Sequence, residues 1–174
     1  MRKQPGFNFI IERLKKSHRR ERFSCGDDAL DRYIRRQAGQ DQKKNVAATF
    51  VLIDRDSGAI AGFYTLSMNS VHLNDLPEET RKHLPRYPDV PAALLGRLAV
   101  DSRYKGRGLG GHLLIDAMKR CLDNEIAVFC LIVDAYKDAA KFYADYGFME
   151  LPGHANRMFL PMKTIEKLFK EDTN

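Results

Sequence analysis

The sequence predicts a single mixed α/β domain spanning residues 1–174. Segments rich in β-branched and aromatic residues alternate with segments whose apolar residues recur at helical spacing. Near the middle, residues 93–133 read as a strand, a glycine-rich link, a helix and a second apolar strand. A chain of this length normally forms one domain with a substantial core.

The first elements follow from hydrophobic patterning and capping signals. The apolar run Phe7–Leu14 predicts a first strand. Ser24 with Asp27 three residues later approximates a capping box, so we expect a helix to start there and to bury an apolar stripe. Two strands joined by a short polar hairpin are predicted over Ala47–Ile53 and Ile60–Met68.

Prolines mark the next stretch. Pro77 suits the first turn of a short helix, and three prolines in Pro85–Pro91 predict an extended loop. Ile126–Val133 is apolar throughout, as in a strand covered on both faces. The remaining elements are predicted as strands over Ala93–Val100, 148–151 and Asn156–Leu160, and as helices over Leu109–Leu122, 136–146 and Thr164–Lys170.

Charge is distributed unevenly along the chain. The net charge is +6, but residues 1–44 alone hold 13 Lys/Arg against 6 Asp/Glu, a net of +7. Such a basic segment indicates either a polyanionic partner or a solvated basic edge. The longest apolar run has eight residues, whereas a membrane-spanning helix needs about 20. We therefore expect no membrane association.

Cysteine usage and the N-terminus indicate the compartment. The three cysteines are odd in number and form no C-x-x-C motif, which is typical of reduced thiols in a cytoplasmic protein. The N-terminal residues lead into no long apolar stretch, so no secretory signal is visible. We expect a cytoplasmic protein without a bound metal.

The most informative segment links residues 93–100 to the helix that starts at Leu109. It contains Gly106, Gly108, Gly110 and Gly111, with Lys105 and Arg107 beside them. Glycines allow positive φ and close approach to a ligand, and the first turn of a helix offers unpaired N–H groups to a phosphate. The P-loop pattern is absent, and the G-x-G-x-x-G match is weak because four residues separate it from the strand.

Two blocks of sequence resemble the GNAT-type N-acetyltransferase superfamily. Residues 100–110 resemble its acetyl-CoA signature R/Q-x-x-G-x-G/A, with Lys105 at the Arg/Gln position. Residues 139–148 resemble its A-x-x-F-Y-x-x-x-G-F block, and Tyr136 stands where many members have Asn. The resemblance implies the GNAT fold, in which a mixed, mostly antiparallel central sheet carries helices on both faces. It also implies acetyl-CoA as cosubstrate.

A narrower resemblance covers most of the chain. Residues 23–31, 62–67, 85–101 and 159–162 are similar to blocks in the GNAT-fold toxins of bacterial type II toxin–antitoxin modules. Members acetylate the α-amino group of aminoacyl-tRNA and thereby block translation. Each is held inactive by a cognate ribbon–helix–helix-type antitoxin. We expect these partners here, together with a homodimer, which the apolar residues of the last helix would suit.

The resemblance implies roles for individual residues. Tyr143 would be the catalytic residue that donates a proton or hydrogen bond to the departing thiolate of CoA. The backbone of residues 98–100 would pair with the amides of the pantetheine arm. The expected cosubstrate-binding residues are Leu98, Ala99, Val100, Lys105, Gly106, Arg107, Gly108, Leu109, Gly110, Gly111 and Phe142.

The sequence gives less information about the residues that would bind the second substrate and about the general base. Candidate tRNA contacts are Arg35, Arg36, Arg86 and Arg97. Asp101 and Glu150 could act as general base, but lone carboxylates of this kind usually face solvent. Two other functions stay open: an acetyltransferase for a small amine or a protein N-terminus, and an inactive GNAT fold that only binds a partner. The sequence does not identify the tRNA or the amino acid that is acetylated.

Overall fold

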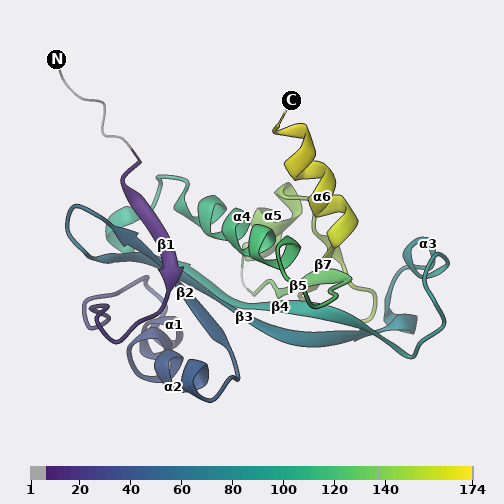
Figure 1. Ribbon diagram of the computed structural model, residues 1–174, viewed down its shortest axis with the longest axis horizontal. Helices are drawn as coiled ribbons and strands as arrows, with labels where there is room; N and C mark the ends of the chain where they lie inside the picture. Colours follow the sequence, from purple (N-terminus) through teal and green to yellow (C-terminus); the bar gives the residue numbers. More distant parts are fainter. Residues whose placement is uncertain (1–6, 137, 174) are drawn as a thin grey trace. The chain divides into compact units, whose positions relative to one another are not determined.

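The structure, a computed structural model, describes residues 7–136 and 138–173. Its described strands form one seven-stranded sheet in the order β1-β2-β3-β4-β5-β7-β6 (Figure 1). The β4–β5 pair is parallel, whereas the β1–β2, β2–β3, β5–β7 and β6–β7 pairs are antiparallel. The prediction of a mixed, mostly antiparallel sheet is therefore confirmed.

The strands are β1 (Phe9–Arg13), β2 (Ala48–Asp54), β3 (Ile60–His72), β4 (Asp89–Val100), β5 (Cys130–Asp134), β6 (Met149–Glu150) and β7 (Arg157–Pro161). The α-helices are α1 (Asp28–Arg32), α2 (Ala38–Lys43), α3 (Glu78–Arg81), α4 (Leu109–Leu122), α5 (Ala139–Asp145) and α6 (Met162–Glu171). A π-helical turn η1 (Tyr33–Gln37) joins α1 to α2, and short 3-10 turns are η2 (Leu73–Asp75) and η3 (Ser102–Tyr104). No helix among the described residues is long and apolar enough to cross a membrane.

The chain divides into two compact units. The first contains Met1–Leu66 and Arg97–Ala117, and the second contains Ser67–Gly96 and Met118–Asn174. Strands β3 and β4 and helix α4 each contribute residues to both units. A single domain over residues 1–174 stays a prediction.

In the first unit, side-chain alternation along β2 and β3 directs apolar groups to both faces of the sheet. On one face, Val51 and Phe63 pack with Ile34 in a buried cluster beneath α1 and η1. On the other face, the rings of Phe50 and Tyr64 stack with centroids 5.1 Å apart. The Tyr64 hydroxyl donates a 2.5 Å hydrogen bond to Asp116 of α4. Helices therefore cover both faces here, as predicted (Figure 1).

Gly62 of β3 permits a close approach between β3, β4 and α4. A Cβ at this position would lie 2.8 Å from Leu113 Cδ1 and 2.9 Å from the Ala99 carbonyl oxygen. Real Cβ atoms essentially never make contacts this short. The absence of a side chain therefore lets α4 pack directly on the strand pair, which fixes the start of that helix.

The second unit has its own core. Ala92, Cys130, Ile132 and Phe159 belong to a buried cluster built from β4, β5 and β7. Residues 130–133 of β5 are all fully buried, as expected for a central strand. Helix α6 packs against β7 and buries Ile165 completely.

Several predicted boundaries are wrong: β3 extends to His72 instead of Met68, and α5 begins at Ala139 instead of residue 136. Asp27, not Ser24, caps α1, because its carboxylate accepts hydrogen bonds from the N–H groups of Ala29 and Leu30. Strand β5 begins at Cys130, and the side chain of Ile126 is 65% exposed. Strand β4 begins at Asp89, inside the proline-rich stretch that we expected to be a loop. The cap of α1 is decided by local hydrogen bonds of Asp27, whereas Cys130, where β5 begins, pairs with Ala92 of β4 and Pro161 of β7.

We expect Gly62→Ala to destabilise the protein by about 2 kcal/mol, since the new methyl group cannot fit without moving the backbone of β4. Urea unfolding followed by circular dichroism measures this change. A midpoint equal to that of the wild type would contradict the packing described for β3, β4 and α4.

Candidate functional site

The glycine-rich turn lies between η3 and α4. Gly106 and Gly108 have φ of 78° and 73°, a conformation that residues with a side chain rarely adopt. A Cβ at either position would meet no atom within 4 Å. The turn is therefore open on the side where these two residues face, and its backbone is accessible to a ligand.

Helix α4 supplies hydrogen-bond donors next to this turn. Its intrahelical bonding begins with the His112 N–H, which donates to the Gly108 carbonyl at 3.3 Å. The N–H groups of Leu109, Gly110 and Gly111 precede this bond, and groups at this position have no acceptor within a helix. Together with the partial positive charge of the helix N-terminus, they suit a phosphate group.

Aromatic side chains hold the turn in place. The Tyr104 hydroxyl donates to Asp54 at 2.8 Å, which connects η3 to the β2–β3 hairpin. The Arg107 guanidinium lies 5.2 Å from the centroid of the Phe9 ring and 5.7 Å from that of Tyr104. Its charge therefore stays beside the turn while its side chain remains exposed.

The side chain of Lys105 is engaged within the protein. Its Nζ donates a 2.6 Å hydrogen bond to the carbonyl oxygen of Cys25. The amine therefore holds the segment that precedes α1. Its role as a ligand of the cosubstrate stays a prediction.

Asp101 does not face solvent, so that expectation is wrong. Its side chain is 1% exposed and accepts hydrogen bonds from the Ser24 N–H and from the backbone and guanidinium of Arg103. Burial on its own would raise the pKa of Asp101, but the bonds from Arg103 and Ser24 outweigh it and lower that pKa. A carboxylate so fully engaged is a weak general base. Glu150, by contrast, is exposed on β6, as expected.

The strand that precedes the turn extends past its parallel partner. The β4–β5 ladder covers Ala92–Leu95 and ends there. Residues Leu98–Val100 lie beyond that ladder, with Ala99 buried and its two neighbours half-buried. Among the described strands, β3 is the one that flanks them, so one edge of this stretch has backbone groups available to an extended ligand.

Tyr143 lies in α5, in the second unit. It is 7% exposed, and its ring packs edge-on against Phe142 and Phe148 at 5.1 and 5.4 Å. Within the described part of the chain, no group makes a hydrogen bond with its hydroxyl. Burial raises the pKa of Tyr143 to about 12. The phenol therefore keeps its proton at neutral pH, as a proton donor must.

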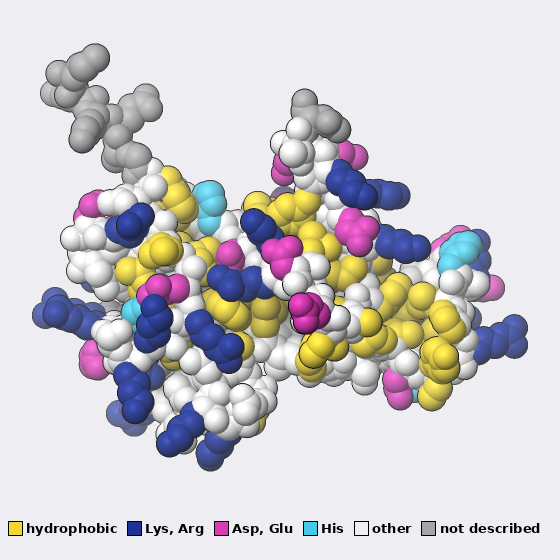
Figure 2. All heavy atoms as spheres, in the orientation of Figure 1, with side chains coloured by type: hydrophobic (Ala, Val, Ile, Leu, Met, Phe, Trp, Pro, Cys, Tyr) yellow, Lys and Arg dark blue, Asp and Glu magenta, His cyan; other side chains and the backbone are white. Residues whose placement is uncertain are grey.

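Three of the arginines predicted to contact RNA lie in the first unit. The Arg97 guanidinium stacks over the Tyr33 ring at 3.6 Å, and Arg35 donates to the Phe23 carbonyl. Both therefore serve packing around α1 and η1. The Arg36 side chain is exposed. Figure 2 shows that Lys and Arg side chains gather over α1 and α2.

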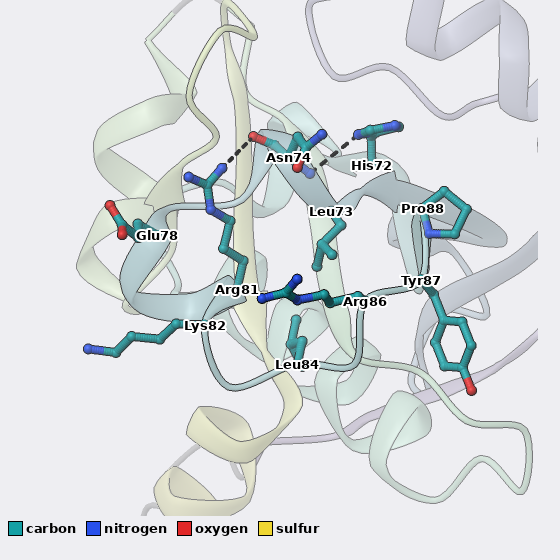
Figure 3. Close-up of a pocket in the computed structure, with 10 residues that line it drawn as sticks. All are labelled: His72, Leu73, Asn74, Glu78, Arg81, Lys82, Leu84, Arg86, Tyr87 and Pro88. Carbon is teal, nitrogen blue, oxygen red and sulfur yellow. Dashed lines mark hydrogen bonds between the residues drawn. The ribbon is translucent and has the colours of Figure 1, made fainter.

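Arg86 lines a cavity of about 750 Å³ in the second unit, formed by η2, α3 and the loop before β4 (Figure 3). Its guanidinium points into the cavity between Leu73 and Leu84, whereas Tyr87 points away. No described residue forms an ion pair with it. Arg81 also lines this cavity and donates to the Asn74 carbonyl at 3.3 Å. Arg81 was not among the predicted RNA contacts, although its neighbours Lys82 and His83 make this part of the sequence basic.

Alignments with known proteins of similar sequence cover most of the chain. The model of the acetyltransferase (GNAT) family matches residues 11–148. A "tRNA-acetylating toxin" of Mycobacterium tuberculosis is 38% identical over 149 residues, covering 84% of this chain and 87% of that protein. A "Probable toxin TacT" of Sinorhizobium fredii is 32% identical over 170 residues, covering 91% and 94%.

Solved structures agree with the sequence matches. The toxin AtaT complexed with acetyl-methionyl-tRNAfMet is 30% identical, has a TM-score of 0.86 and covers 92% of this chain and 99% of that one. AtaTR bound with AcCoA is 29% identical with a TM-score of 0.79, covering 93% and 98%. A mutant AtaT bound to the C-terminus of the antitoxin AtaR is 27% identical with a TM-score of 0.77, also covering 93% and 98%. In sequence and in fold, the chain belongs to the acetyltransferase (GNAT) family.

Proposed function

We propose that this protein transfers the acetyl group of acetyl-CoA to the α-amino group of aminoacyl-tRNA, and that it is the toxin of a toxin–antitoxin pair. The observation that carries the proposal is its 38% identity with a tRNA-acetylating toxin over most of both chains. The likeness to AtaT in complex with acetyl-methionyl-tRNAfMet supports the same substrate.

The glycine turn supports a role in holding the pyrophosphate of CoA. Gly106 and Gly108 leave the backbone of the turn open to a ligand. The first N–H groups of α4 have no acceptor within the helix and are therefore available to a phosphate. In this proposal the free edge of Leu98–Val100 pairs with the pantetheine amides, as an added strand would. Phe142 contributes apolar surface beside Tyr143.

The chemical step requires a neutral amine and a stabilised leaving group. The amine nitrogen attacks the thioester carbonyl carbon, the carbon–sulfur bond breaks, and the CoA thiolate takes a proton from Tyr143. The amine releases its own proton to water, and Tyr143 is reprotonated from solvent. An α-amino group has a pKa of about 7.7–8.0, so a useful fraction is neutral near pH 7 without a strong base. The engagement of Asp101 in the fold is consistent with such a mechanism.

Partners follow from the same proposal. AtaT binds the C-terminus of the antitoxin AtaR, and we infer a cognate antitoxin of the ribbon–helix–helix type for this chain. Among the predicted RNA contacts, Arg36 and Arg86 are those whose guanidinium groups have no hydrogen-bond or ion-pair partner among the described residues. The substrate implies action in the cytoplasm, and the homodimer stays a prediction.

The central test incubates the protein with labelled acetyl-CoA and a pool of charged tRNAs. We expect label on the amino acid of one or more tRNAs, identified by sequencing the labelled RNA. Deacylated tRNA is the control and should stay unlabelled, since it lacks the amine. Label appearing only on small amines or protein N-termini would contradict the proposal.

Tyr143→Phe should lower the rate of acetyl transfer by roughly 10²-fold or more, because the general acid is removed while the ring packing remains. Tyr146→Phe is the matched control, since this half-buried neighbour also contacts Phe142, with ring centroids 5.3 Å apart. Acetyl-CoA affinity, measured by calorimetry, should be unchanged in both variants. Wild-type turnover in Tyr143→Phe would remove this residue from the mechanism.

The pH dependence of kcat should show one rising limb. The amine becomes reactive as pH rises through its pKa, whereas Tyr143 stays protonated up to its pKa of about 12. Rates measured from pH 6 to pH 10 should therefore rise to a plateau without a second, falling limb. A fall near pH 8 would mean that a different acid, with a lower pKa, protonates the thiolate.

A further inference from the structure

A second basic cavity lies in the first unit, apart from the glycine turn. It measures about 410 Å³ and is formed by the end of β1, the loop that follows it, and α2. Five of its lining residues are cationic, and none of its described lining residues is acidic: the cations are Arg13, Lys15, Lys16, Arg20 and Lys43.

Most of these cations have no counter-charge among the residues that the structure describes. Lys15 pairs with Glu12 at 3.1 Å, at the surface. Among the described residues, the other four have neither a carboxylate nor a hydrogen-bond partner for their side chains. Positive groups gathered in one concavity repel one another, so an anion that enters it gains the attraction of all of them.

The loop that carries three of these cations is held in a defined conformation. The Lys15 N–H donates to His18 Nδ1 at 3.0 Å, so His18 Nε2 carries the ring proton and donates to Glu12 at 2.7 Å. The amide of Gln42 in α2 donates to the Leu14 carbonyl at 2.8 Å and accepts from the Thr49 N–H at 3.3 Å. The walls of the cavity are thus cross-linked by hydrogen bonds.

Gly39 explains how Arg20 reaches this cavity. A glycine inside a short helix weakens it, yet here it provides space for a side chain from another segment. A Cβ on Gly39 would lie 3.0 Å from a guanidinium nitrogen of Arg20. The guanidinium therefore lies directly against the backbone of α2, and Arg20 lines the same cavity as Lys43.

We propose that this cavity binds phosphates of an RNA backbone. A single phosphate monoester carries roughly −1.5 to −2 charges at pH 7, fewer than the four unpaired cations here. Successive phosphates of a polynucleotide would match them better than one small anion. The proposal rests on tRNA as the proposed substrate and adds a contact that shares no residue with the glycine turn, so it leaves the CoA phosphates to that turn.

The test compares Arg20→Gln/Lys43→Gln with Lys163→Gln/Lys167→Gln. Both double variants lose two positive charges, and the second pair is exposed on α6, outside the cavity. Binding of fluorescent tRNA is measured by anisotropy at several salt concentrations, and acetyl-CoA binding by calorimetry. We expect the cavity variant to bind tRNA about tenfold more weakly at 0.1 M salt and its salt slope to fall by about 1–2. The control should change less than twofold, and both should bind acetyl-CoA normally.

Other outcomes would overturn the proposal. Equal losses in the two double variants would mean that only net charge matters. Tight binding of inorganic pyrophosphate that the cavity variant alone loses, with tRNA binding intact, would assign the cavity to a free polyphosphate. Loss of binding to a polyglutamate peptide alone would assign it to an acidic protein segment. Lys16→Gln, a milder single variant, is measured in parallel, so that a folding defect in the double variant cannot mimic the result.

The binding measurement is independent of catalysis. If the wild type binds tRNA through this cavity but never acetylates it, the proposed function fails and the cavity proposal stands. If tRNA is acetylated and the cavity variant binds it as well as the control does, the proposed function stands and the cavity proposal fails.

Discussion

The arrangement of the first unit depends on the hydrogen bonds that attach Phe23–Cys25 to the end of β4. The Ser24 N–H donates to the buried carboxylate of Asp101, and the Ser24 carbonyl accepts from the Ser102 N–H at 2.8 Å. Lys105 adds a bond to the Cys25 carbonyl. Residues Asp101–Lys105, which follow β4 and lead into the glycine turn, therefore also hold the segment that precedes α1.

This attachment makes Asp101 a structural residue. A buried carboxylate is costly unless it is paired, and Arg103 with two backbone N–H groups supplies that pairing. On the other side of the segment, Asp31 accepts from the Cys25 N–H at 2.8 Å and from the Ser24 hydroxyl at 3.3 Å. Two buried acids thus hold one loop, and the position of α1 relative to the turn is determined by charge-assisted hydrogen bonds.

The basic residues consequently divide into two groups. Arg35, Arg97 and Lys105 bond or stack within the protein, so their charge is partly used in the fold. Of the cations around α2 and the loop after β1 that line the cavity, Arg20 is half-buried and the other four are exposed, and all but Lys15 lack a partner among the described residues. The net charge of +7 in residues 1–44 is therefore a poor guide to which side chains meet a ligand. Only those that lack a partner in the fold offer full electrostatic attraction to a polyanion.

The sequence by itself determined the mixed α/β class, the 109–122 helix, the glycine turn and the family, because these depend on local periodicity and on short blocks of fixed spacing. It also identified Tyr143, but only through the family block. The tertiary structure alone revealed that Tyr143 is buried, which raises its pKa to about 12, and that Asp101 is engaged in hydrogen bonds. It moved the cap of α1 from Ser24 to Asp27 and removed Ile126 from β5. It also brought Arg20 against Gly39. The Asp27 cap is a local choice between two neighbouring acceptors. The bond from Ser24 to Asp101 and the contact of Arg20 with Gly39 join residues distant in sequence, and local pattern does not encode which of those contacts form.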